Sequence, residues 1–378
     1  MPSYDIMIVG GGAVGLATAY LSAAKGFRVA LVERGNVLSG ATGFSAGIVT
    51  TQLSLEEDVR LALRTIEVLE SVQRTSEVEF MEETGFVTIE PYWMVEESAR
   101  VLSSQSVKYE VLDESEVRDA VPFLTIRDYE RGLRTYRDKV VDSDQLGKAY
   151  SKLCRLLEID VYSRSKIIEA RKSGDSIEGI VLDREGLIRA DSVVFAAGPW
   201  NKTLMSELGI YDVPTVIYRC QVVKVKTAAP NRYVPFYVAE NHLYMRKDIG
   251  MTSIAGNGYS KVVERVEDAI GAVEIEYVHH IVDLLLKRVR TPEKFFVVGG
   301  WSGPCSSTSD GMPLIGRVPG TSNCFIVDGL DGYGLMRSAG VAELLLDSVT
   351  TGKEVEWASP SREMVFNGDE EVVELHSI

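Results

Sequence analysis

The apolar and polar positions of residues 4–33 follow a strand, helix, strand pattern. Residues 4–9 form a short apolar run, which predicts a buried strand. A glycine-rich stretch follows, a helix-compatible segment ends near residue 25, and residues 29–33 form a second apolar run. Two buried strands joined by a helix predict a βαβ unit in a parallel sheet.

Helical periodicity returns further along the chain. Apolar residues at helical spacing predict a helix within residues 54–83. Residues 140–144 are placed to cap a helix from residue 145 to about residue 157. Two more helices are predicted, over about 267–290 and over 339–349.

Strand-like runs fill most of the remaining chain. Residues 161–189 contain short runs that predict a small antiparallel sheet, and residues 190–195 predict a strand of the parallel type. Residues 86–139 and 213–295 combine short mixed segments with strand-like runs. These two stretches indicate that the chain leaves its first domain twice.

The glycine-rich stretch contains a dinucleotide-binding fingerprint. Gly10, Gly12 and Gly15 fill the G-x-G-x-x-G positions, which serve a tight turn, approach to a pyrophosphate, and close packing of helix on strand. Glu33 lies 18 residues after Gly15, where a carboxylate can bind ribose hydroxyls and would repel the 2′-phosphate of NADP. A glycine-rich turn without a ligand is the alternative, but the flanking strands and helix favour dinucleotide binding.

We therefore predict an α/β fold in which a Rossmann-like dinucleotide-binding domain is interrupted twice by an α+β domain with a mixed sheet. The first domain is predicted to comprise residues 1–85, 140–212 and 296–357, the second domain residues 86–139 and 213–295, and a loosely held acidic tail residues 358–378.

Three other loops carry small residues where backbone can approach a ligand. Residues 38–49 are small and hydroxylated, and residues 196–200 end a predicted strand. Residues 329–336 lead into a helix whose positive N-terminus and free N–H groups would suit an electron-rich ring oxygen. A flexible loop and a plain strand end are the alternatives for the first two. A second G-x-G-x-x-G is absent from the sequence, which counts against a reductase with separate flavin and nicotinamide domains.

Composition excludes several classes of function. The 378 residues include 40 basic and 55 acidic side chains, and the net charge of −15 does not suit nucleic acid or an anionic membrane surface. No uncharged apolar run is long enough to predict a membrane span, and we expect a cytoplasmic protein. The four cysteines stand far apart, which predicts neither a disulfide framework nor a zinc site, and the four histidines add no metal-ligand spacing. No metal is expected.

With these segments in place, the chain resembles the D-amino acid oxidase family of flavoproteins, which includes glycine oxidase, sarcosine oxidase and the β subunits of dye-linked proline dehydrogenases. The segments that carry the resemblance are residues 10–15 with Glu33, and residues 40–47, 196–200, 308–316 and 329–335.

The resemblance implies an extended, non-covalent FAD. The pyrophosphate would lie at residues 10–15, the adenosine ribose at Glu33, the adenine beside Ile167, and the flavin along residues 41–48, with residues 332–336 at its pyrimidine edge. The implied cofactor-binding residues are Gly10, Gly12, Ala13, Val14, Gly15, Glu33, Arg34, Ala41, Thr42, Ser45, Ala46, Gly47, Ile48, Ile167, Ala197, Gly198, Trp200, Gly303, Asp331, Gly332, Tyr333, Gly334, Leu335 and Met336.

The sequence departs from the family at the substrate site. Glycine oxidase has a carboxylate-binding arginine where this chain has Cys305, and sarcosine oxidase has a carboxylate-binding lysine where this chain has Met336. The cysteine that holds flavin covalently in sarcosine oxidase falls at Gly303, hence the expectation of non-covalent FAD. Cys305 is interpreted either as a contact to flavin or substrate or, more simply, as a buried inert thiol.

Another cation must then meet a substrate carboxylate, because an unpaired buried anion is costly. The candidates are Arg246, Arg219 and Arg337, in that order, and surface salt bridges are the alternative for each. The aromatic residues predicted to wall the pocket, unless they are simple core residues, are Tyr244, Tyr333 and Trp301.

The expected reaction is hydride transfer from the carbon of a small amine or amino acid to flavin N5, giving an imine that hydrolyses. Oxygen, a quinone or a partner subunit would accept the electrons. Two alternatives stay open at this point: oxidation of a hydroxylated substrate such as glycerol 3-phosphate or a 2-hydroxy acid, and a non-catalytic FAD-carrying subunit of a larger complex.

Overall fold

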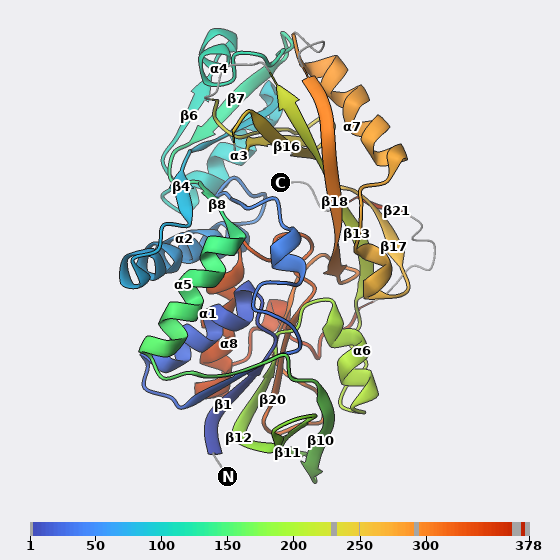
Figure 1. Ribbon diagram of the computed structural model, residues 1–378. Helices are drawn as coiled ribbons and strands as arrows, with labels where there is room; N and C mark the ends of the chain where they lie inside the picture. Colours follow the sequence, from blue (N-terminus) through green and yellow to red (C-terminus); the bar gives the residue numbers. More distant parts are fainter. Residues whose placement is uncertain (1–2, 228–232, 249, 291–294, 365–371, 375–378) are drawn as a thin grey trace.

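The structure is a computed structural model that describes residues 3–227, 233–248, 250–290, 295–364 and 372–374 (Figure 1). Two large sheets organise it. Figure 1 shows one sheet in the lower half and the other in the upper half, with the long strands β13 and β18 running from the upper half toward the lower.

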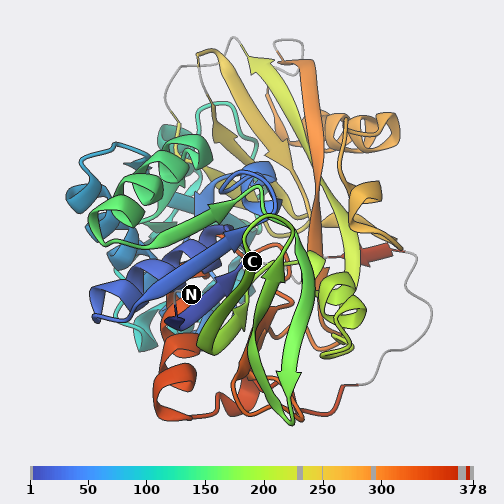
Figure 2. The ribbon, with the colours of Figure 1, turned by 60° about the horizontal axis from the view of Figure 1, so that its bottom comes forward.

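The lower sheet has eight strands in the order β10-β11-β12-β1-β2-β9, with β20 pairing to β12 and β19 to β20. The strands are β1 (Ser3–Val9), β2 (Val29–Glu33), β9 (Asp160–Ser163), β10 (Ile167–Ser173), β11 (Ser176–Leu182), β12 (Gly186–Phe195), β19 (Leu314–Arg317) and β20 (Cys324–Asp328). The centre is parallel, and Val9 lies beside both Val32 and Phe195, so the carboxyl ends of three strands meet at one edge. Figure 2 shows the antiparallel β10–β12 edge in green beside the blue N-terminal strands.

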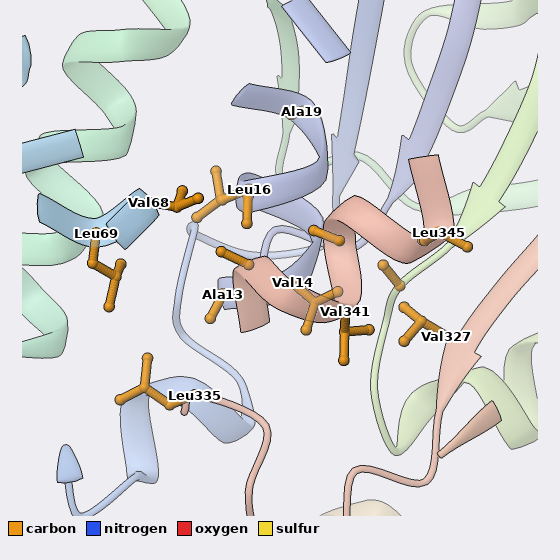
Figure 3. Close-up of a cluster of buried hydrophobic side chains, with 14 of the residues drawn as sticks. Ala13, Val14, Leu16, Ala19, Val68, Leu69, Val327, Leu335, Val341 and Leu345 are labelled. Carbon is orange, nitrogen blue, oxygen red and sulfur yellow. The ribbon is translucent and has the colours of Figure 1, made fainter. Parts of the chain in front are cut away.

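Helices cover this sheet through close backbone contacts. The helices of the chain are α1 (Ala13–Ala24), α2 (Glu56–Ser76), α3 (Tyr92–Ser104), α4 (Glu114–Ala120), α5 (Ser143–Leu156), α6 (Trp200–Glu207), α7 (Ile275–Arg288) and α8 (Ser338–Thr351), with short 3₁₀ turns η1 (Ala41–Phe44), η2 (Val266–Ala269) and η4 (Glu356–Ala358). A Cβ on Gly340 of α8 would lie 2.6 Å from the Leu61 oxygen of α2. The apolar faces of α1, α2 and α8 meet with β20 in one buried cluster (Figure 3).

The upper sheet has ten strands. They are β5 (Phe86–Pro91), β6 (Tyr109–Leu112), β7 (Glu130–Thr135), β13 (Val216–Thr227), β14 (Phe236–Val238), β15 (Leu243–Lys247), β16 (Thr252–Gly256), β17 (Tyr259–Val263), β18 (Phe295–Ser307) and β21 (Val372–Glu374). Val223, Phe236 and Ile281 are fully buried in its core, to which α7 contributes. A three-stranded sheet of β3 (Ile48–Val49), β4 (Met81–Glu83) and β8 (Lys139–Val141) is separate from both.

Several elements differ from the sequence-based expectations. The helix expected within 54–83 ends at Ser76, where Glu77 adopts a left-handed conformation, and the helix expected over 267–290 is divided into η2 and α7. Strand β9 pairs in parallel with β2 and is not part of an antiparallel sheet. These differences arise because long-range pairing and local turns override the apolar pattern.

The ends of the expected domain segments also differ. Strand β18 pairs with β13 of the ten-stranded sheet, so the chain returns to the eight-stranded sheet only at β19. The tail is held at two places: Arg362 donates to the Asp310 carboxylate at 2.8 and 2.9 Å, and β21 pairs with β17. The proposed domain boundaries stay a prediction. Among the helices of the described ranges, none is both long and apolar enough to cross a bilayer.

Candidate active site

A cavity of about 780 Å³ lies where the two sheets meet. It begins at the carboxyl ends of β1, β2, β12 and β20, and its far wall comes from β13, β15 and β18. A parallel sheet offers its ligand site at this edge, and the volume lies in the range of ligand and cofactor pockets.

The N-terminus of α1 forms one wall of the cavity. Its N-cap residue, Gly12, has no side-chain cap, and the first turn of the helix contains no acidic residue. Gly10 has φ +111°, and a Cβ there would lie 2.5 Å from the Ala196 oxygen. Gly15 does not line the cavity; a Cβ on it would lie 1.9 Å from the Gly10 oxygen, so it serves the packing of helix on strand. The backbone amides and the positive dipole at such a helix end can bind an anion such as a pyrophosphate.

The carboxylate of Glu33 is held beside this helix end. Its Oε2 accepts a hydrogen bond from the Gly11 amide at 2.8 Å, and its Oε1 accepts one from the Gly35 amide at 2.6 Å. The Arg34 guanidinium lies 5.3 Å from the centre of the Trp200 ring, and Ile167 completes this end of the cavity. A fixed carboxylate suits the hydroxyls of a ribose, and an apolar side chain suits an adenine.

The loop at residues 41–48 is tied to the same helix. Thr42 Oγ1 accepts a hydrogen bond from the Ala13 amide at 3.1 Å. Ala41, Ser45, Ala46 and Ile48 all line the cavity. Gly47 does not; its φ of +73° and a Cβ position 2.3 Å from the Val141 oxygen show why glycine is required there.

The glycine-rich loop before α8 lines the opposite wall, through Asp331, Gly332, Tyr333, Gly334, Leu335 and Met336. The expectation that α8 itself points free amides at a ligand differs from the structure. The amides of Ala339 and Gly340 both donate to Thr65 Oγ1 at 3.1 Å, so the first turn of the helix is capped from α2.

These features fit an extended dinucleotide cofactor. The fit rests on the N-terminus of α1, the close approach at Gly10 and the carboxylate of Glu33, which lie in sequence along one cavity. Among the predicted cofactor-binding residues, only Gly15 and Gly47 stand outside the lining, and both are explained by backbone packing.

The far wall of the cavity carries hydroxyl and imidazole groups. Tyr244 lines it, as predicted, together with Tyr237 and His242. The Tyr237 hydroxyl lies 2.6 Å from His242 Nδ1. Trp301 does not line the cavity; its indole N–H donates to the Phe44 carbonyl at 2.8 Å and so ties β18 to η1.

None of the three candidate arginines lines the cavity. Arg246 is 8% exposed and its guanidinium donates to the carbonyls of Ala46 and Lys247. Burial lowers the pKa of Arg246, although the charge of Asp248 opposes this. Its position on β15 is two residues beyond Tyr244, where the loop at residue 46 covers it.

The other two arginines are also engaged elsewhere. Arg219 donates to the carbonyls of Asp268 and Ala272, and Arg337 pairs with Asp58 at 2.7 Å beneath the Tyr333 ring. Within the described part of the chain, the lysine and arginine side chains that line the cavity are Lys166 and Arg34, at the Glu33 end.

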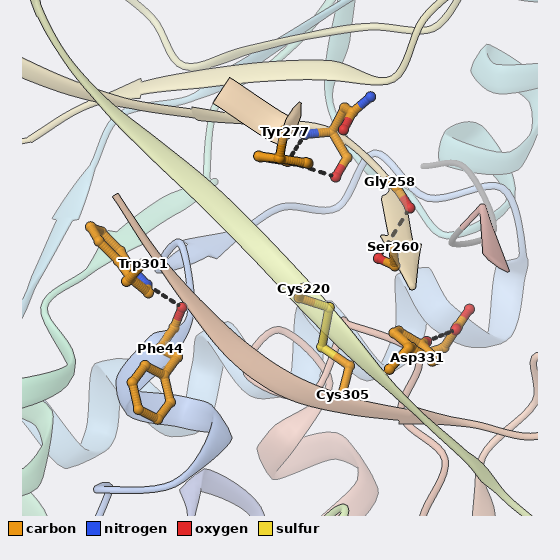
Figure 4. Close-up of a disulfide and its surroundings, with 10 residues drawn as sticks. Phe44, Cys220, Gly258, Ser260, Tyr277, Trp301, Cys305 and Asp331 are labelled. Carbon is orange, nitrogen blue, oxygen red and sulfur yellow. Dashed lines mark hydrogen bonds between the residues drawn. A yellow bond between two sulfur atoms is a disulfide. The ribbon is translucent and has the colours of Figure 1, made fainter. Parts of the chain in front are cut away.

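The interpretation of Cys305 as a buried inert thiol is wrong. Cys220 on β13 and Cys305 on β18 form a disulfide with a Cα–Cα distance of 6.3 Å, and both line the cavity (Figure 4). The pairing of two antiparallel strands brings together residues separated by 85 positions, a contact that cysteine spacing does not reveal. Cys154 and Cys324 are free and buried, and burial raises the pKa of their thiols to about 11 and about 12.

Sequence reasoning also missed Tyr237, His242 and Cys220. All three lie in the strand-rich segment 213–295, and no spacing marks them as site residues. The available signal was one of the strand-like runs of this segment, residues 242–246, which starts at His242.

Asp328, at the end of β20, lines the cavity and is 1% exposed. It accepts hydrogen bonds from Ser306 Oγ at 2.6 Å and from the Gly329 amide at 2.7 Å. Burial outweighs these bonds and raises the pKa of Asp328 from 3.8 to about 6. The folded protein therefore binds more protons than the unfolded chain between these values, and stability falls as the pH rises through this window.

We predict that Asp328→Asn removes this loss of stability with rising pH. The variant should gain stability relative to the parent between pH 4 and pH 6, on the order of 3 kcal/mol at most. Thermal unfolding measured across this window tests it, and equal shifts at all pH values would contradict it. Asp310→Asn is the control of opposite sign, because hydrogen bonds from Arg362 and Thr308 overcome burial and lower the pKa of Asp310 to about 2. Its loss of stability at neutral pH should vanish as the pH falls from about 4 to about 2.

Comparison with known proteins agrees with this geometry. Residues 5–348 match the model of the DAO family, described as FAD dependent oxidoreductase. Glycine oxidase of Pseudomonas aeruginosa is 25% identical over 371 residues, covering 93% of this chain and 96% of that protein. The 4-methylaminobutanoate oxidase (formaldehyde-forming) of Paenarthrobacter nicotinovorans is 23% identical, and the match covers 92% of this chain but only 43% of that protein.

The crystal structure of L-proline dehydrogenase from P. horikoshii superposes with a TM-score of 0.87 at 21% identity, covering 96% of this chain and 98% of that one. The predicted fold class and the family resemblance are thereby confirmed.

Proposed function

Because the chain belongs to the DAO family of FAD-dependent oxidoreductases, we propose that it oxidises the carbon–nitrogen bond of a small amine or amino acid. One observation carries the proposal: a single cavity joins a dinucleotide cradle on one sheet to a polar wall on the other. The similar proteins named above support it, since each is named for oxidation or dehydrogenation of an amine or amino acid.

The chain supplies binding and orientation. Gly10 to Val14 would hold the pyrophosphate of FAD, Glu33 the ribose, and Gly332 to Met336 the edge of the ring. Bound FAD would supply two-electron oxidation, by which the substrate amine would become an imine that hydrolyses in water. Gly303, which lines the cavity, has no side chain that could bond to the cofactor, so we propose non-covalent FAD.

Hydrogen-bonding side chains would recognise the substrate. His242, with Tyr237 at its Nδ1, can present Nε2 to a carboxylate, and Tyr244 stands beside it on the same wall. Lysine and arginine line only the other end of the cavity within the described residues, so a substrate anion at this wall would rely on hydrogen bonds. The two negative charges of a phosphate would be costlier there than the single charge of a carboxylate. This favours a small amine or amino acid over glycerol 3-phosphate.

We predict that His242→Ala raises KM by at least about tenfold and lowers kcat less, since His242 contacts substrate and not the electron acceptor. Steady-state kinetics with the substrate identified below test this. His279→Ala is the matched control, because His279 is exposed on α7 and does not line the cavity. An unchanged KM in His242→Ala would remove His242 from the substrate site.

Anaerobic mixing of the FAD-loaded protein with separate substrate classes tests the function. The panel contains D- and L-amino acids, N-methyl amino acids, simple amines, 2-hydroxy acids and glycerol 3-phosphate, and the measurement is the loss of visible flavin absorbance. We expect loss with an amine or amino acid. Loss only with hydroxylated compounds would overturn the proposed reaction, and no loss with any compound would favour a non-catalytic FAD-carrying subunit.

A further inference from the structure

The Cys220–Cys305 disulfide is part of the cavity wall. Both cysteines are half-buried and line the cavity, next to Gly303 and Pro304 of β18. Figure 4 shows the bond crossing from β13 to β18, with Asp331 of the glycine-rich loop nearby. The disulfide therefore shares one space with the residues that would face the flavin ring.

The two strands do not depend on the bond for their pairing. Strands β13 and β18 are hydrogen-bonded along nearly their whole lengths, with Tyr218 opposite Cys305 and Cys220 opposite Gly303. The link closes a loop of 85 residues, so it also limits the unfolded chain. A disulfide buried between a strand and a helix would limit the unfolded chain equally well, whereas this disulfide is open to the cavity.

The disulfide lies away from the lysine and arginine side chains of the cavity, which among the described residues are at the Glu33 end. Tyr218, which neighbours Arg219 and Cys220 on β13, donates its hydroxyl proton to Asp331 and so occupies that carboxylate. The free cysteines Cys154 and Cys324 are buried and do not line the cavity, so they cannot intercept the reaction.

We propose that the Cys220–Cys305 disulfide is a second redox centre, which exchanges two electrons reversibly with FAD bound in the same cavity. In the forward direction the S–S bond breaks, each sulfur gains one electron and one proton, and reduced FAD returns to the oxidised form. One proton comes from the reduced cofactor and the other from water. The holoprotein would thus store four electrons in place of two.

The test uses the full chain loaded with FAD and reduced by light under anaerobic conditions, so that it needs no substrate. Electrons are counted during the titration, and cysteines are trapped by alkylation and identified by mass. We expect four electrons per FAD and two newly alkylated residues, Cys220 and Cys305. The same treatment of the apoprotein should leave both cysteines unalkylated, because FAD is the electron donor.

Two variants complete the test. Cys220→Ser with Cys305→Ser should take up two electrons, and Cys154→Ala should still take up four. Full reduction of FAD by two electrons with Cys220 and Cys305 unalkylated in the parent protein would overturn the proposal, and this outcome does not depend on whether the serine variant folds. Failure of every amine in the substrate panel would leave this result unaffected, so the two proposals are tested separately.

Discussion

Gly12→Val should lose FAD binding without losing the fold. The residue has extended backbone angles, φ −77° and ψ −179°, which valine adopts readily. A Cβ at this position meets only Thr42 Oγ1, at 3.6 Å, so the added side chain extends into the cavity. It would occupy the space that the pyrophosphate must enter, and we expect affinity for FAD to fall at least about 100-fold, roughly 3 kcal/mol.

Equilibrium titration of the apoprotein with FAD measures this loss, and thermal unfolding of the apoprotein should show little change. Gly147→Ala is the matched control: its Cβ would lie 3.5 Å from Leu38 Cδ1, in ordinary contact, within helix α5. This variant should bind FAD as the parent does. Normal affinity in Gly12→Val would contradict a pyrophosphate at the end of α1.

Among the variants proposed here, Arg288→Met should lower the free energy of unfolding the most. Arg288 is 1% exposed, and it donates to both oxygens of Glu130, at 2.8 and 2.6 Å, and to Glu240 at 2.7 Å. Glu130 is also 1% exposed. Removing the arginine leaves a buried carboxylate without its counter-charge, which costs about 3–5 kcal/mol.

Chemical denaturation at neutral pH measures this cost. Arg100→Met is the control, because Arg100 and its partner Glu97 are both largely exposed, and exposed pairs contribute little to stability. The double variant Arg288→Met with Glu130→Gln should recover part of the loss, since it removes the uncompensated charge. Equal stability of Arg288→Met and Arg100→Met would show that the buried pair does not stabilise the ten-stranded sheet.

The cofactor half of the site was predictable because its signals are local. The spacing of Gly10, Gly12 and Gly15, followed by Glu33, encodes a turn, a helix end and a carboxylate within one βαβ unit. The backbone conformation at these positions requires small residues, so small residues in the sequence indicate that conformation directly. Gly15 and Gly47 are glycines for the same steric reason, although neither lines the cavity.

The substrate half was not predictable to the same degree, because it depends on pairing between distant strands. Whether Arg246 or His242 reaches the cavity depends on how β15 lies against the loop at residue 46, and no local pattern encodes that contact. The Cys220–Cys305 bond follows from the register of β13 and β18, two strands whose partners are far apart in the sequence. The same register explains why β18 joins the ten-stranded sheet.

The backbone contact between Leu61 and Gly340 has a consequence for protein synthesis. Helices α1 and α2 are translated early, but their packing surface is completed by α8, near the end of the family match at residue 348. In a nascent chain, α1 and α2 therefore lack part of their packing surface until residues 338–351 leave the ribosome. Residues 330–336, which line the cavity, also lie near this end of the sequence, so the cavity is complete only late in synthesis. Chains that stop before α8 should be recognised by proteases and degraded.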